Sequence, residues 1–216
     1  MKPLFLGSHP AMDLLNTRPA PRGAPIELIG DGTSYVAWLE GARLLHDSTA
    51  QKLRRRFGAA ALDAAAVEAR DLREWARDWI ARWQNAPRGT WKAQLRRLNQ
   101  LLARAKSYPE MVSTKDGVAV AERWRIDSAD ELIAVVAAQI ASLVATEERG
   151  LVKRCAGPGC TLWFVDRTKA HSRLFCSATA CGNRAKVAAF RERQRGTRRR
   201  PVTPAGAGSR AQSSRL

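Results

Sequence analysis

The four cysteines of this 216-residue chain form two pairs near its C-terminal end, each with the spacing C-x4-C. The pairs are Cys155/Cys160 and Cys176/Cys181, and residues 161–175 separate them. Two loops that each supply two thiolates provide the donor set of a tetrahedral zinc site. Gly157 and Gly159 flank a proline, which allows the first loop to fold back on itself. The spacing therefore predicts a small module held together by one structural Zn²⁺ ion.

Other arrangements of these side chains remain open at this point. The cysteines could instead form two disulfides or be four unrelated buried thiols, and His171 could replace one of them as a ligand. The start of the chain is broken by Gly7 and Pro10, so it does not resemble a signal peptide. The run Leu132–Thr146 is too short for a membrane span of about 20 residues. We therefore expect a cytoplasmic protein, in which reducing conditions favour metal ligation over disulfides.

Positive charge is concentrated around the cysteines. Residues 151–216 contain 15 Lys and Arg against 2 Asp and Glu, a net charge of +13, whereas residues 1–150 contain 22 against 18, a net charge of +4. A zinc ion with four thiolates has a net charge of about −2, which offsets only a small part of the excess. A basic segment around a zinc module favours a polyanionic partner, most often nucleic acid.

Helical periodicity dominates the first 150 residues. Apolar side chains at helical spacing predict helices from Thr33, after an N-cap at Ser48, over Leu62–Trp83, over Thr90–Lys106, and from the Ser128–Glu131 capping box to about Glu147. The last of these has no polar face and is expected at the centre of the core.

The helix predicted over Leu62–Trp83 has the clearest amphipathic pattern. Trp75, Trp79 and Trp83 share one face, and Arg73 is expected off that face. The tryptophan face could be core or could line an effector pocket.

One segment has the period of a strand instead. Between Met111 and Ile126, apolar residues alternate after the turn Lys115–Gly117, which predicts a β-hairpin. The fold class is therefore α+β and mainly α: a helical N-terminal domain with one hairpin, and a small C-terminal four-cysteine zinc finger with a basic helix. We expect domains at 1–149 and 150–196, and a disordered basic tail at 197–216.

A basic helix is predicted to follow Cys181. Arg184, Arg191 and Arg195 line up on one face at about 100° per residue. A neighbouring strip of Val187 and Phe190 could cover the zinc site, with Lys186 and Arg193 beyond it. Arginine binds phosphates and guanine edges bidentately, so this helix suits a DNA groove. A solvated basic face without a fixed partner is the alternative.

Two motifs resemble known bacterial families. The string Cys181-Gly182-Asn183-Arg184 after a C-x4-C pair resembles the CGNR zinc finger, and Gly7–Thr17 resembles the opening motif of the ABATE domain that accompanies it. The resemblance covers nearly all of residues 5–195. Phe175 and Ala178 depart from the usual tryptophan and methionine near the third cysteine, but neither is a ligand.

The resemblance implies a stress-induced transcription regulator. It also implies that Asn183 and Arg184 matter, either by contacting DNA or by bracing the start of the helix. His9, Asp13 and Asn16 belong to the opening motif, and their polar groups need hydrogen-bond partners, either in the protein backbone or in a small ligand.

We therefore expect a DNA-binding transcription regulator. Its nucleic-acid contacts are predicted at Asn183, Arg184, Lys186, Arg191, Arg193 and Arg195. An RNA-binding or ribosome-associated protein is the alternative, although no aromatic stacking platform is evident. Four cysteines close the zinc coordination shell, so enzymatic activity is not expected. A homodimer and a small-molecule effector would suit this function, in the cytoplasm at the nucleoid.

Overall fold

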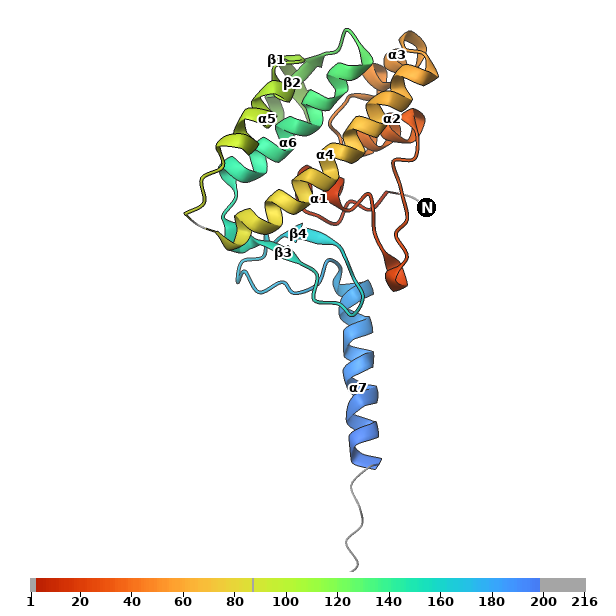
Figure 1. Cartoon of the computed structure of the whole chain (residues 1–216), viewed down its shortest axis with the longest axis vertical. Helices are drawn as coiled ribbons and strands as arrows, with labels where there is room; N and C mark the ends of the chain where they lie inside the picture. The colour runs from red at the N-terminus through yellow and green to blue at the C-terminus, as the bar shows by residue number, and fades with distance from the viewer. Residues whose placement is uncertain (1–2, 87, 199–216) are drawn as a thin grey trace, which may run out of the picture.

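A computed structural model describes residues 3–86 and 88–198 of the chain (Figure 1). Two antiparallel hairpins interrupt a mainly helical architecture. The helices are α1 (Pro10–Leu15), α2 (Gly32–Gly41), α3 (Asp47–Arg56), α4 (Ala59–Asn85), α5 (Lys92–Leu102), α6 (Leu132–Thr146) and α7 (Asn183–Arg198). The strands are β1 (Lys106–Thr114), β2 (Gly117–Arg125), β3 (Val152–Arg154) and β4 (Trp163–Val165). The predicted α+β, mainly α class is confirmed.

Helix α6 lies in the centre of the helical layer because almost all of its side chains are apolar. It packs against α1, α4 and α5, and Leu132, Ile140 and Leu143 are fully buried. With the preceding 3-10 turn, Ala129–Thr146 is long and apolar enough to pass a compositional test for a membrane span. Half of that segment is buried inside the protein, as is typical of a core helix.

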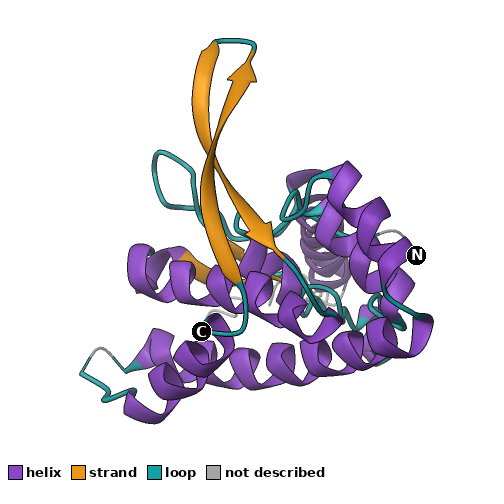
Figure 2. Cartoon of the chain, turned by 90° about the horizontal axis from the view of Figure 1, so that it is seen from above, coloured by secondary structure: helices purple, strands orange, loops and turns teal. Residues whose placement is uncertain are grey.

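The two hairpins occupy opposite environments. The hairpin β1–β2 pairs Lys106 with Arg125 and Thr114 with Gly117, and Figure 2 shows it projecting from the helical body. Most of its side chains are exposed. In contrast, β3–β4 pairs only three residues of each strand, and Val152, Trp163 and Val165 belong to the main apolar core.

Several predicted boundaries were wrong by a few residues. Ser48 does not cap α3; the imidazole of His46 accepts the first hydrogen bond instead. The capping box at Ser128 is not formed, since Ala129–Glu131 is a 3-10 turn and α6 begins at Leu132. Helix α5 ends at Leu102 because the chain turns into β1, so the hairpin begins at Lys106 and not at Met111.

Arg73 is the largest departure from the predicted helix faces. Its side chain is 2% exposed, and it makes two hydrogen bonds of 2.7 Å to the carboxylate of Glu27. Its Nε also donates to Glu74, and Nη1 donates to the hydroxyl of Thr17. A buried guanidinium needs partners for all its donors, and here most of them lie far away in the sequence, at Thr17 and Glu27. Trp79 and Trp83 are buried as core residues, and Trp75 packs against them from a partly exposed position.

Helix α7 leaves the body of the protein at the zinc module. Figure 1 shows it extending away from the helical layer, joined by the π-helical turn Ala178–Gly182. The predicted cover of the zinc site is wrong, because Val187 and Phe190 are about half exposed on this projecting helix. The helix runs to Arg198, so the predicted tail at 197–216 otherwise lies outside the described residues.

Candidate metal centre and basic helix

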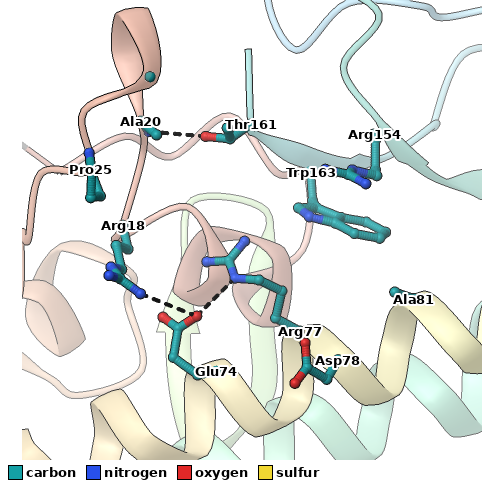
Figure 3. A pocket seen from close by; sticks show the side chains of 11 residues that line it. Arg18, Ala20, Pro25, Glu74, Arg77, Asp78, Ala81, Arg154, Thr161 and Trp163 are labelled. Atoms are coloured by element: carbon teal, nitrogen blue, oxygen red, sulfur yellow. Dashed lines mark hydrogen bonds and ion pairs between the residues drawn. The ribbon is translucent and has the colours of Figure 1, made fainter. Parts of the chain in front are cut away.

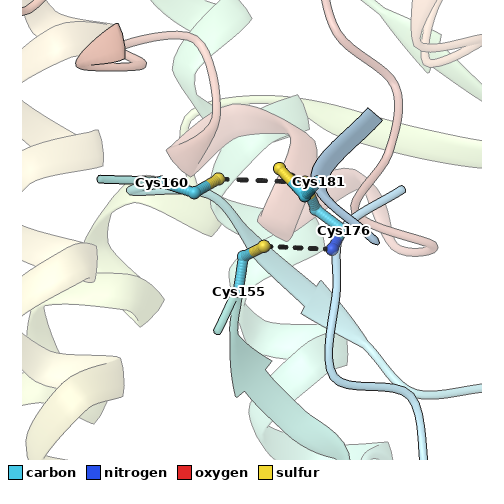
Figure 4. Close-up of side chains that lie close together, drawn as sticks. All are labelled: Cys155, Cys160, Cys176 and Cys181. Atoms are coloured by element: carbon cyan, nitrogen blue, oxygen red, sulfur yellow. Dashed lines mark hydrogen bonds between the residues drawn. The ribbon is translucent and has the colours of Figure 1, made fainter. Parts of the chain in front are cut away.

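The four cysteines converge on one point at the base of α7 (Figure 4). All four Sγ atoms lie within 4.8 Å of one another. Cys176 Sγ is 3.5 Å from Cys181 Sγ and 3.8 Å from Cys160 Sγ. A tetrahedral zinc ion with Zn–S bonds of about 2.3 Å separates its sulfurs by about 3.8 Å. The donor set and its spacing therefore fit one zinc ion, as the sequence predicted.

The first ligand loop depends on its glycines. Gly159 has φ +67°, in the left-handed region that side chains rarely adopt. Gly157 faces the sulfurs, and a Cβ placed there would lie 3.1 Å from Cys181 Cβ and 3.3 Å from its Sγ. Cys160 N donates to the Gly157 carbonyl, which closes the turn between the first two ligands. The loop therefore leaves little space beside the metal position for any side chain larger than hydrogen.

Hydrogen bonds to sulfur favour the thiolate form of one cysteine, which is the form that binds a cation. Burial would raise the pKa of Cys155, but the backbone N–H groups of Cys176 and Gly157 donate to its Sγ and lower the pKa overall. Burial raises the pKa of Cys160 to about 11, and burial and the neighbouring thiols raise the pKa of Cys176 further. Four thiolates cannot share this space without a cation, which a zinc ion would supply.

Arg184 has a partner inside the metal centre. Its Nη2 lies 2.9 Å from Cys181 Sγ, and the hydrogen bond and charge of this thiol raise the pKa of the guanidinium. The guanidinium of Arg184 can therefore offset the negative charge of a metal–thiolate cluster, although the Arg184 side chain as a whole is exposed. Asn183, the preceding residue, is the first residue of α7, and its side chain is exposed.

Two further side chains, which the sequence did not single out, hold the zinc module in shape. The fully buried carboxylate of Asp166 accepts from Lys153 Nζ, from the backbone and hydroxyl of Thr168, and from the backbone of Arg173. Burial opposes ionisation, but these donors lower the pKa of Asp166 overall. Arg173 donates to the carbonyls of Phe175, Cys176 and Leu6 and lies 4.2 Å over the ring of Phe164.

His171 lies outside the metal cluster. It is exposed, has φ +48°, and its carbonyl accepts a hydrogen bond from Lys153 Nζ. The apolar cover of the cysteines comes instead from Leu4, Leu6, Leu162 and the half-buried Phe175. Phe175 thus packs at the third cysteine, where the sequence departs from the motif that it resembles.

The polar residues of the opening motif bond to the protein itself. His9 is the N-cap of α1, where its Nδ1 accepts from Ala11 N, and burial lowers its pKa. The Asp13 carboxylate accepts from Gly7 N at 2.7 Å, but burial outweighs this bond and raises the pKa of Asp13 to about 6. Gly7 in turn accepts a hydrogen bond from Val165 N of β4. Both side chains therefore order the segment that lies along β4.

Asn16 joins the opening motif directly to the zinc module. Its Nδ2 donates to the Trp163 carbonyl at 2.9 Å, and its Oδ1 accepts from Trp163 N at 2.8 Å. The amide satisfies the backbone of β4 as a neighbouring strand would, and it is 1% exposed. Residues far apart in sequence thus form a single joint, which no local pattern could have revealed.

The predicted nucleic-acid residues gather on α7. Lys186, Arg191 and Arg193 are exposed on the projecting helix, and Arg195 follows on the same element. Within residues 183–194 the structure shows no fully buried side chain. The helix therefore presents Lys186 and Arg191 to solvent along its projecting length.

Two family comparisons agree with this arrangement. Residues 152–194 match the CGNR zinc finger, and residues 8–147 match the family described as "Putative stress-induced transcription regulator", the ABATE domain. A search of curated proteins found no match. The second match covers more than half of the chain, and the two together include both the joint and the metal centre. The chain belongs to the ABATE family and contains a CGNR zinc finger at residues 152–194.

Proposed function

We propose that this protein is a DNA-binding transcription regulator in which α7 and the zinc finger contact DNA. In this proposal, the helical domain of residues 1–149 receives a signal and the finger of residues 150–196 delivers it. The family supports a regulator of transcription, and the direct contact with DNA is the part that requires a test. The protein would act in the cytoplasm, at the nucleoid.

The projection of α7 is the observation that carries this proposal. The helix contacts the π-helical turn at its base and extends beyond the body (Figure 1). An isolated helix of about 16 residues is only marginally stable in water, so a long exposed helix suggests a partner surface. The major groove of DNA is about 12 Å wide and admits one α-helix.

The basic side chains on α7 favour a negatively charged partner. Lys186, Arg191, Arg193 and Arg195 are basic, and Glu192 is the only acidic residue of the helix. Arginine side chains can contact phosphates from several sides of a helix in a groove. Asn183 and Arg184 lie at the base, where Arg184 would link the metal centre to the DNA backbone.

The first test measures salt-dependent binding. A fluorescently labelled duplex is titrated with the protein between 50 and 200 mM salt, with and without Arg191→Ala plus Arg193→Ala. If each arginine contacts one phosphate, the log–log slope of affinity against salt falls by about 0.9 per arginine. Arg55→Ala, on an exposed face of α3, is the matched control. Equal slopes for all three proteins would contradict a role of α7 in DNA binding.

Competition with RNA tests the alternative function. Phe190 is 54% exposed beside the basic residues of α7 and could stack on an unpaired base. Structured RNA and duplex DNA are therefore offered together, and selection from random duplexes seeks a preferred site. Preference for RNA, and loss of that preference in Phe190→Ala, would support an RNA-binding function instead.

We also propose that the protein acts as a homodimer, since a single helix contacts few base pairs. Hairpin β1–β2 supplies a suitable surface, because Met111, Val118 and Val120 share one face and are 66–76% exposed. Such an apolar face can pair with its own copy about a twofold axis. Light scattering at micromolar concentration should give twice the chain mass, and Val120→Glu should give the monomer.

A further inference from the structure

A cavity lined by both charged and apolar residues lies where the helical domain meets the zinc finger. Its volume is about 490 Å³, within the range of small-molecule sites. One wall is α4, a second is the loop that contains Arg18, and a third is formed by Arg154 and Trp163 of the finger (Figure 3). At its rim, Ala20 N donates to the hydroxyl of Thr161, a bond between the two parts of the chain. A molecule in this cavity would therefore touch both of them.

Two arginines of the cavity have hydrogen-bonding capacity to spare. Arg154 lies 5.4 Å over the Trp163 ring, and no carboxylate is within ion-pairing distance of it among the described residues. The closest carboxylate of Arg18 is Glu74, at 3.7 Å, and Arg18 is 44% exposed. Each guanidinium has five N–H donors, so both can donate hydrogen bonds to an anionic ligand.

The acidic residue beside Arg18 is already shared. Glu74 receives Arg73 at 2.8 Å and Arg77 at 3.2 Å in addition to Arg18. Burial lowers the pKa of Arg77, and the charges of Arg73 and Arg18 add to this effect despite the ion pair with Glu74. The cluster around Glu74 therefore contains more positive charge than its carboxylates neutralise.

We propose that this cavity binds a small organic dianion, with one anionic group on Arg18 and the other on Arg154. Figure 3 shows these side chains on different walls, which favours two separated anionic groups over a single one. Asp78 also lines the cavity and has no ion-pair partner among the described residues, so it can accept a hydrogen bond from a ligand hydroxyl. The inference deepens the proposed function, because the dianion would be the signal that reaches the finger.

Direct binding tests the site without DNA. Calorimetric titration of the zinc-loaded full chain with succinate and malate should give saturable binding, and acetate and inorganic phosphate should bind at least tenfold more weakly. Arg18→Gln and Arg154→Gln should each weaken dianion binding about tenfold or more, the loss expected for one charged hydrogen bond. Arg55→Gln, outside the cavity, should bind as the wild type does.

Three results would overturn the inference. They are no saturable binding of either dianion at millimolar concentration, equal affinity for acetate, and unchanged affinity in both cavity variants that are shown to be folded by circular dichroism. Because no nucleic acid is present, a failure of DNA binding leaves this result intact. A failure of dianion binding likewise leaves the DNA-binding proposal intact.

Discussion

The two hairpins of this protein obey the same pairing rules and have opposite surroundings. Hairpin β1–β2 has nine residues in each strand and projects into solvent, whereas β3–β4 has three in each and lies between the core and the metal centre. The short hairpin is stabilised by its surroundings. Trp163 and Val165 pack into the main core, the amide of Asn16 binds the backbone of Trp163, and the cysteines adjoin both strands. A strand's stability in this fold therefore follows from what contacts it more than from its length.

Removal of the metal should have the largest effect, and that effect should be confined to the short hairpin. Chelation at pH 7, or Cys176→Ser, should abolish amide protection across β3–β4 while leaving that of β1–β2 unchanged. Structural zinc contributes on the order of 10 kcal/mol in small fingers, more than a three-residue hairpin can replace. Hydrogen exchange with mass spectrometry measures both regions in one experiment. Ser172→Ala, an exposed neighbour, is the control, and full protection after chelation would contradict a structural metal.

Loss of the Asn16 amide should have the next largest effect. Asn16→Ala leaves the buried N–H and C=O of Trp163 without partners, which should lower the free energy of unfolding by about 3 kcal/mol. Urea denaturation measures this change. Asn99→Ala, at an exposed position of α5, should change it by less than about 0.5 kcal/mol. Equal effects at both positions would show that the joint adds little.

A matched valine pair tests the hairpins directly. Val165→Ala removes methyl groups from a fully buried site of β4 and should cost about 2 kcal/mol of stability. Val120→Ala removes the same atoms from a site of β2 that is 66% exposed, and should cost less than about 0.5 kcal/mol in the monomer. In the proposed dimer, which covers this face, the loss at Val120 should be larger and should depend on protein concentration.

The smallest expected effect is a pH dependence of stability caused by Asp13. The pKa of Asp13 is raised from 3.8 to about 6, so the folded state holds this proton more tightly than the unfolded chain. The wild type should therefore lose stability as pH rises from about 4 to 6, and no more above that range. Asp13→Asn keeps an oxygen that can accept from Gly7 N and removes the cost of burying a charged carboxylate. The new NH2 group has no partner and offsets part of this gain, so the variant should be more stable by about 1 kcal/mol at pH 7.

Unfolding at several pH values checks this expectation. The difference between variant and wild type should grow from pH 4 to pH 6 and then stay constant. Asp116→Asn, in the exposed turn of the projecting hairpin, should show no such change. A constant difference across the whole range would mean that Asp13 titrates in the folded protein as it does in the unfolded chain.

The sequence predicted features that depend on near neighbours. The cysteine ligands, the central helix and the turn of β1–β2 follow from spacing, period and turn residues within one segment. Arg73 was misplaced because its partner Glu27 lies 46 residues away, and helical period alone assigns a charged residue to the surface. The suggestion that Val187 and Phe190 could cover the zinc site was wrong, because Leu4 and Leu6, from the other end of the chain, take that position.

The joint and the cavity could not be predicted for the same reason. Asn16 is 147 residues from Trp163, and the walls of the cavity come from three separate parts of the chain. Local sequence identifies these side chains as polar or aromatic, but only the fold determines which of them meet.

The attachment of α7 at the turn beside the metal centre has a geometric consequence. A helix of 16 residues is about 24 Å long, so a tilt of about 10° at Gly182 would move its far end by about 4 Å. That displacement is comparable to the rise of one base pair. If α7 binds DNA as proposed above, slight repacking beneath the finger would be enough to shift the tip of this helix by about one base pair along a groove.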